Sequence, residues 1–262
     1  MLISALLGMA IGLVMALTGA GGGILAVPVL GFGAGLSVAV AAPIGLLAVS
    51  VAAALGALLG LRQGQVRYKA ALLIAFCGMA MAPGGLWLAQ RTDNRWLSLL
   101  FASVLMYVAY RGLHDAGRPG VGSRPPPACV RDSSTGRFIW TALCARVLAA
   151  AGAVAGALSG LLGVGGGFVV VPALRRYTDL PMPSVLATSL AVIALITASG
   201  VVSSALAGSM NWVIALPFTA GAVGGMLAGR LLAGRLAGPH LQKAFAVLAA
   251  GVAGGMMIKV LL

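Results

Sequence analysis

Residues 18–30 read TGAGGGILAVPVL, and residues 162–174 read LGVGGGFVVVPAL. The two stretches lie 144 positions apart and share seven of 13 residues, including four glycines and the proline. The same offset aligns Gly64-Gln65-Val66-Arg67-Tyr68 with Gly208-Ser209-Met210-Asn211-Trp212. Separated segments that share one offset are the mark of an internal repeat. We therefore predict that the chain consists of two homologous halves.

The composition around this repeat is typical of a membrane protein. Hydrophobic residues make up 61% of the chain and charged residues 8%, with a mean hydropathy of +1.08, whereas soluble domains carry about 25% charged residues. Backbone groups in lipid must be hydrogen-bonded within their own segment, so we expect helices. The sequence thus predicts an all-α, polytopic helical membrane protein. Its apolar runs reach or exceed the roughly 20 residues that cross a bilayer. They are 2–35, 38–61, 70–90, 96–113, 141–174, 183–207, 211–234 and 241–262, of which the first and fifth are unusually long.

One segment, 114–140, interrupts the apolar pattern. It is rich in Pro, Gly and Arg, which is typical of an exposed linker. We expect it to join a first transmembrane repeat, 1–113, to a second, 141–262.

The first apolar run of each half is interrupted by Gly-x-Gly-Gly-Gly, with a proline five residues after the last glycine. Consecutive glycines favour departure from the helix, and a proline cannot donate to the preceding turn. Irregular backbone at membrane depth lines a cavity or is buried in protein. Paired interrupted segments in matching halves point to the substrate site of a transporter. A helix that restarts after the glycines would turn its amides and positive dipole end toward an anion. Glycines that serve close helix packing are the alternative interpretation.

The duplicated glycine motif, the two four-segment halves and the chain length resemble the TauE/SafE sulfite exporter family, over both halves but not the linker. The resemblance implies a permease for sulfite, sulfoacetate or related anions. It also implies a polar Thr-Ser pair after the second motif, which Thr188-Ser189 matches; the first half departs, with Pro43-Ile44 at the matching positions. The candidate substrate-binding residues are Thr18, Gly19, Gly21, Gly22, Gly23, Pro28, Gly163, Gly165, Gly166, Gly167, Pro172, Thr188 and Ser189.

The charges favour one of two topologies. The chain has 17 Lys and Arg against four acids, all Asp, for a net charge of +13. If every run crosses once, ten basic residues face one side and seven the other. If the glycine-broken runs are re-entrant hairpins, each half has three full spans, the halves are inverted and the count becomes 14 against three. The second arrangement obeys the positive-inside rule better, and both place the linker in the cytoplasm. We expect a multi-pass protein of the inner (plasma) membrane.

The residue inventory also limits the function. No acid lies inside an apolar run, so we expect neither an enzyme nor a carrier of cations, and no metal or cofactor. The basic residues flank apolar runs, so we expect no nucleic-acid partner. The three cysteines show no pattern, which favours free thiols over a disulfide framework. The sequence predicts an anion permease that works by alternating access, with the lipid bilayer and a small anion as partners. An anion channel, a non-transporting membrane scaffold and a homodimeric state stay open.

Overall fold

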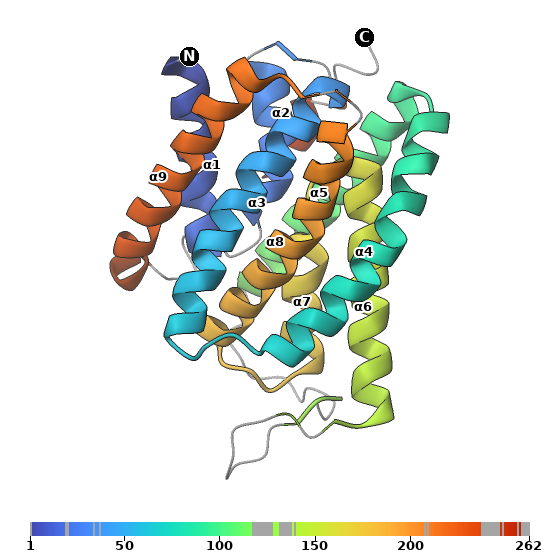
Figure 1. The fold of residues 1–262 in the computed structure, drawn as a ribbon, viewed down its shortest axis with the longest axis vertical. Helices are drawn as coiled ribbons and strands as arrows, with labels where there is room; N and C mark the ends of the chain where they lie inside the picture. The colour runs from blue at the N-terminus through green and yellow to red at the C-terminus, as the bar shows by residue number, and fades with distance from the viewer. Residues whose placement is uncertain are drawn as a thin grey trace.

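The computed structural model describes residues 2–18, 21–33, 35–36, 38–116, 128–130, 138, 140–206, 208, 210–236, 247, 249–255 and 257. These residues form helices and connecting turns, without a named strand among them (Figure 1). The helices are α1 (Leu2–Thr18), α2 (Gly21–Gly33), α3 (Val38–Arg62), α4 (Tyr68–Arg91), α5 (Asn94–Ala116), α6 (Ala142–Leu162), α7 (Gly167–Tyr177), α8 (Met182–Leu206) and α9 (Trp212–Leu236). The predicted all-α class is confirmed. Gly19, most of the 114–140 linker and much of the run 241–262 lie outside the described residues.

Five of the described helices, α3, α4, α6, α8 and α9, are long and apolar enough to cross a membrane. The helices α1 and α2 divide the first apolar run between them, as α6 and α7 divide the fifth. The helix α5 continues to Ala116, three residues past the predicted end of the first repeat. The division into repeats and linker stays a prediction.

The packing of helices repeats at the offset of the sequence repeat. Helix α1 packs along α9, and α6, which stands 144 positions after α1 in sequence, packs along α4. In the same way α3 contacts α9 while α8 contacts α4, and α3 and α8 cross one another in the middle of the bundle (Figure 1). At that crossing Ser50 Oγ donates to Ala194 O, 3.5 Å away and 144 positions later.

Backbone meets backbone in the two largest of these contacts. A Cβ atom added to Gly8 would overlap the carbonyl oxygen of Phe218, and one added to Gly152 would overlap that of Ile74. Gly152 lies 144 positions after Gly8, and Phe218 lies 144 positions after Ile74, so the two contacts correspond to one another. One turn further along, Gly156 packs against Gly78 in the same manner. Small residues are needed at these positions because they let membrane helices approach closely.

The turn between α3 and α4, the start of α6 and the turn between α7 and α8 lie at one end of the bundle, the lower end in Figure 1. In the α3–α4 turn, the backbone N–H of Arg67 donates to Thr188 Oγ1, 3.1 Å away near the start of α8. Next to the α7–α8 turn, Cys129 forms an isolated parallel bridge with Thr178. The turn between α4 and α5 lies at the opposite end.

A disulfide joins Cys129 to Cys144, in the first turn of α6. The expectation of free thiols is therefore wrong for two of the three cysteines, while Cys77 is free. The physical reason is a backbone contact distant in sequence: Cys129 N–H donates to Tyr177 O, 2.9 Å away. This bond holds Cys129 at the end of α7, where it reaches Cys144 of α6, and no local sequence pattern indicates it.

Two adjacent glycines in α4 test the role of close packing. A Cβ at Gly85 would overlap the carbonyl oxygen of Ala157 in α6, whereas a Cβ at Gly84 meets nothing within 4 Å. We expect Gly85→Ala to destabilise the protein by about 1–3 kcal/mol through overpacking. Gly84→Ala should be neutral or stabilise by up to about 1 kcal/mol, because alanine is the better helix former. Thermal unfolding of both purified variants measures the difference, and equal melting temperatures would contradict the packing role.

Candidate functional site

The second glycine motif forms an irregular segment between α6 and α7. Gly163 ends α6 in the left-handed conformation (φ 67°), and its N–H donates to Ser159 O, 2.8 Å away. Gly165 (φ 80°) and Gly166 (φ 64°) follow with positive φ as well. These dihedrals favour glycine because a Cβ atom would be strained there. The helix α7 then begins at Gly167.

The start of α7 presents backbone amides toward this irregular segment. Val169 and Val170 donate their N–H groups to Gly166 O, at 3.1 and 3.4 Å. The N–H groups of Gly167 and Phe168, in the first turn, have no acceptor within the helix. Pro172 stands inside α7. The segment thus ends at the positive end of a helix dipole.

The first glycine motif differs from the expectation. Helix α1 ends at Thr18 and α2 begins at Gly21, so Gly21, Gly22 and Gly23 form the first turn of a helix rather than unwound backbone. The prediction that these three glycines themselves leave the helix is wrong. Helical φ and ψ are open to glycine too, and packing decides which it adopts. Pro28 lies inside α2, and the predicted site residue Gly19 lies outside the described residues.

The two motifs lie next to each other in the interior. A Cβ atom on Gly23 would lie 3.1 Å from Val164 O, the carbonyl oxygen in the middle of the second motif. The Val49 side chain of α3 lies between them, because its Cγ1 would be 3.5 Å from such an atom on either Gly23 or Gly165. Gly22, Gly23 and residues 164–167 are buried. Gly23 of the first motif and Gly165 of the second therefore come together beside Val49.

Close packing explains part of the glycine requirement. A Cβ on Gly22 would lie 2.6 Å from Ile11 O in α1, and one on Gly166 would overlap Ala155 O in α6. Ile11 and Ala155 again stand 144 positions apart. Each motif thus folds back against its own preceding helix, as the packing interpretation predicts.

The predicted hydroxyl groups bond to backbone. Ser189 Oγ donates to Leu186 O at 2.8 Å, and Thr18 Oγ1 donates to Val14 O at 2.7 Å. Thr188 is fully buried, and its Oγ1 accepts from Arg67 N–H. These bonds place Thr188 under the α3–α4 turn rather than between the two glycine motifs. At the offset of 144, Thr188 and Ser189 correspond to Ile44 and Gly45, so the match with Pro43-Ile44 is wrong by one residue.

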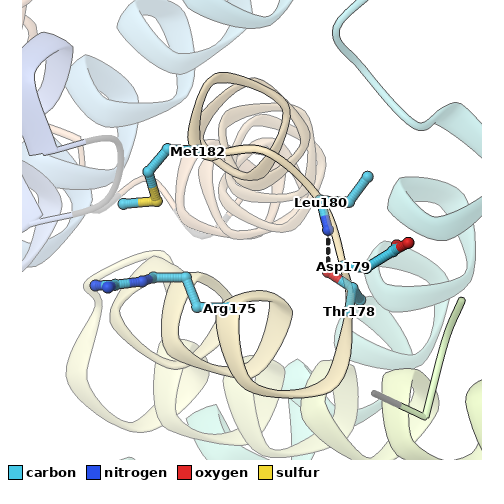
Figure 2. Close-up of a pocket in the computed structure, with 5 residues that line it drawn as sticks. All are labelled: Arg175, Thr178, Asp179, Leu180 and Met182. Carbon is cyan, nitrogen blue, oxygen red and sulfur yellow. Dashed lines mark hydrogen bonds between the residues drawn. The ribbon is translucent and has the colours of Figure 1, made fainter. Parts of the chain in front are cut away.

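A pocket of about 280 Å³ lies at the turn between α7 and α8, and sequence reasoning missed it. In Figure 2 the Arg175 guanidinium and the Met182 thioether reach toward the same side of the turn, and the Asp179 carboxylate extends away from them. Thr178 fixes the turn: its Oγ1 donates to Leu174 O at 2.6 Å and accepts from Leu180 N–H at 3.5 Å. The adjacent arginines Arg175 and Arg176 are the feature of the sequence that could have indicated this pocket.

A second basic group bridges two helices at the same end. Arg230 of α9 donates through Nη1 to Gly56 O, 2.7 Å away in α3, and through Nη2 to Gln63 Oε1 at 3.1 Å. Within the described part of the chain, no group of three His, Cys, Asp or Glu side chains is placed to hold a metal ion.

Comparisons with known proteins identify the chain's relatives. A family model described as "Sulfite exporter TauE/SafE" matches residues 4–256. The chain is 30% identical over 249 residues to a "Probable membrane transporter protein" of Xylella fastidiosa strain Temecula1, covering 93% of this chain and 89% of that protein. It is 41% identical over 69 residues to the "Probable membrane transporter protein YunE" of Bacillus subtilis strain 168, which covers 26% of this chain and 25% of that one.

No solved structure matches the chain. The family model and the Xylella relative nevertheless cover nearly the whole sequence, and they agree with the apolar helices of the bundle. The chain is a multi-pass membrane protein of the TauE/SafE sulfite exporter family of transporters.

Proposed function

We propose that this chain is an inner-membrane permease for small anions, with sulfite and related sulfur oxyanions or organosulfonates as the class carried. The anion binds at the two glycine motifs, and alternating access moves it across the membrane. The observation that carries the proposal is the contact between the motifs beside Val49, within a bundle of this transporter family.

The polar groups near the motifs suit an anion. The first-turn amides of α7 are donors at the positive end of a helix dipole. The four acids are Asp93, Asp115, Asp132 and Asp179, and none lies inside an apolar run of the sequence. A cation at the motifs would therefore lack a carboxylate counter-charge, whereas an anion needs only donors. A proton that accompanies transport would travel on the anion or on water.

We further propose that the two halves are inverted repeats with re-entrant hairpins, α1–α2 and α6–α7. The support comes from contacts that recur at the offset of 144, such as Gly8 with Phe218 and Gly152 with Ile74. The turn between α7 and α8 shares an end of the bundle with the turn between α3 and α4. That arrangement gathers 14 of the 17 basic residues on one side, which is then the cytoplasmic side.

Single cysteines distinguish this topology from eight simple crossings. Gln65→Cys reports the α3–α4 turn, Asp93→Cys the α4–α5 turn, and Pro181→Cys is the test position, because the two topologies assign it to opposite sides. In a Cys77→Ser/Cys129→Ser/Cys144→Ser background we expect Pro181→Cys to react with a membrane-impermeant maleimide from the same side as Gln65→Cys. Reaction from the side of Asp93→Cys would contradict the inverted arrangement.

Binding and transport are measured separately. A ligand at about 100 times its Kd adds about 2.7 kcal/mol to the free energy of unfolding. We therefore expect sulfite, thiosulfate or sulfoacetate to raise the melting temperature of the purified protein by several degrees, and sulfate or small carboxylates to raise it less. In proteoliposomes a carrier saturates and supports counterflow of labelled substrate. Transport without saturation or counterflow indicates a channel, and its absence for every anion indicates a scaffold.

Gly23→Ala tests whether the motifs hold the anion. Its Cβ would lie 3.1 Å from Val164 O, so the contact between the motifs must widen by a few tenths of an ångström. The stability of α2 should not suffer, because alanine has a higher helix propensity than glycine. We expect an anion affinity lowered at least about tenfold, which is about 1.4 kcal/mol, with little change in melting temperature. Gly84→Ala, whose Cβ meets nothing within 4 Å, is the matched control. Unchanged binding in Gly23→Ala would exclude the motifs as the site.

Thr188 is expected to act on stability rather than on binding. Thr188→Val removes the acceptor for Arg67 N–H, and an unsatisfied buried donor costs about 1–3 kcal/mol. Thr188→Ser keeps the acceptor and should restore the melting temperature. A Thr188→Val protein with unchanged stability and weaker anion binding would instead return Thr188 to the substrate site.

A further inference from the structure

The Cys129–Cys144 disulfide connects three parts of the protein. Cys144 lies in the first turn of α6, where its N–H donates to Thr141 Oγ1 at 3.1 Å. Cys129 belongs to the linker, and its N–H donates to Tyr177 O at the end of α7. It is also the bridge partner of Thr178. The bond therefore fixes a linker segment against the α7–α8 turn and the start of α6 at once.

The α7–α8 turn is connected to the proposed substrate site. It lines the 280 Å³ pocket through Arg175, Thr178 and Met182 (Figure 2). It also ends α7, which begins at Gly167 of the second glycine motif and spans 11 residues. A linker segment held on this turn restrains the far end of the α6–α7 hairpin. Movement of that hairpin relative to α8 then has to carry the linker with it.

The basic residues near the disulfide indicate that it lies on the cytoplasmic side, where a permanent disulfide is not expected. Lys69, Arg146, Arg175 and Arg176 belong to the same end of the bundle, which the positive-inside rule assigns to the cytoplasm. Thiols in the cytosol are kept reduced, and the disulfides found there are usually transient and redox-sensing. A disulfide at the most basic end of a membrane protein is therefore better explained as the oxidised state of a reversible thiol–disulfide pair than as a permanent cross-link.

We propose that Cys129 and Cys144 form a reversible thiol–disulfide modification site at the cytoplasmic end, opened by small sulfur nucleophiles. The inference rests on the proposed orientation and carrier function. Opening by a thiol of the glutathione class takes two steps. A thiolate attacks one cysteine sulfur, a mixed disulfide forms, and the electron pair of the Cys129–Cys144 bond leaves on the other sulfur as a thiolate. A second thiolate displaces the bound cysteine, so the protein gains two electrons and the reductant becomes its own disulfide.

Sulfite is the second source of this chemistry. Its sulfur lone pair attacks one cysteine sulfur, forms an S-sulfonate there and expels the other cysteine as a thiolate. The site would then report the concentration of a proposed substrate. Intact mass separates the two arms, because glutathione leaves two thiols and sulfite leaves one thiol and one S-sulfonate.

Both cysteine residues are fully buried, so a nucleophile reaches them only when the linker lifts from the turn. Once the disulfide is open, the contact between Cys129 N–H and Tyr177 O has no covalent support. The linker is then free to leave the turn, and the α6–α7 hairpin loses its restraint. The oxidised protein is therefore the slow form of the transporter and the opened protein the fast form.

Hydrogen exchange tests the site without any transported substrate. In purified wild type, treatment with reduced glutathione should raise the exchange rate of the peptide containing Cys129 at least about tenfold, because local opening governs amide protection. Cys77→Ser should behave as wild type, and the Cys129→Ser/Cys144→Ser double variant should exchange fast with or without glutathione. If the disulfide is shown to be reduced and the amides of the Cys129 peptide exchange no faster than before, the proposal is overturned. Full reactivity of both thiols in untreated protein would overturn it as well.

Labelling and transport complete the test. After reduction in intact cells, a membrane-permeant maleimide should label Cys129 and Cys144, and an impermeant one should not. Labelling by the impermeant reagent would place the pair outside and overturn the switch, whatever the protein carries. In proteoliposomes, reduction should raise the counterflow rate about threefold or more in wild type but not in the double variant, as expected where a conformational step limits turnover. A wild-type rate unchanged by reduction would exclude control of transport, and absence of all transport would count against the proposed function alone.

Discussion

Contact between helix backbones is the constraint on which this architecture depends. Lipid tails are as apolar as the side chains that face them, so burial of apolar surface gives membrane helices little reason to associate, and close van der Waals packing must do so. Glycines supply that packing where α1 crosses α9 and where α6 crosses α4: Gly8 and Gly152 each receive a carbonyl group in the space of a missing side chain. These crossings position α1 and α6, and the glycine motifs follow directly from their ends.

The sequence predicts the parts of this fold that depend on local pattern or on duplication. The run 38–61 corresponds to α3, Val38–Arg62, because one continuous apolar stretch can only be satisfied as helix in lipid. The offset of 144 identified in the glycine motif recurs in contacts such as Gly56 with Leu190 and Gly200 with Leu46. Neither contact could be assigned beforehand, but each follows from the other once the repeat is known.

What the sequence does not predict depends on contacts between distant segments. Gly21–Gly23 begin α2, although three glycines have low helix propensity, because tertiary packing against Ile11 overrides that preference. The Cys129–Cys144 pair requires the linker to reach Tyr177, and no spacing rule encodes that contact. The pocket at Arg175 likewise arises from a turn whose course is set by Thr178.

The hydrogen bonds of the Ser and Thr hydroxyl groups in the helices indicate which donors remain available to bind a solute. Thr197 and Ser199 donate to Ile193 O and Ile196 O, each within its own helix. Such bonds are the usual state of Ser and Thr in membrane helices, and they take up the donors that an anion would use. The backbone amides of Gly167 and Phe168, at the start of α7, have no acceptor within that helix. Recognition by amides rather than side chains would tolerate anions that differ in shape, since charge and donor direction matter more than side-chain fit.

The crossings also limit how such a protein can move. The pairs α1–α9 and α4–α6 each join a helix that precedes the linker to a helix that follows it. Sliding of all helices before the linker past all those after it would separate Gly12 from Ala222 and Gly156 from Gly78, where no side chain could fill the gap. Movement that keeps both crossings intact has two different bodies: α1 with α9, and α6 with α4. The α3–α8 contact, bridged by Ser50 and Ala194, lies between them. Each body carries one glycine motif, so their relative motion would act directly on the contacts of the two motifs with Val49.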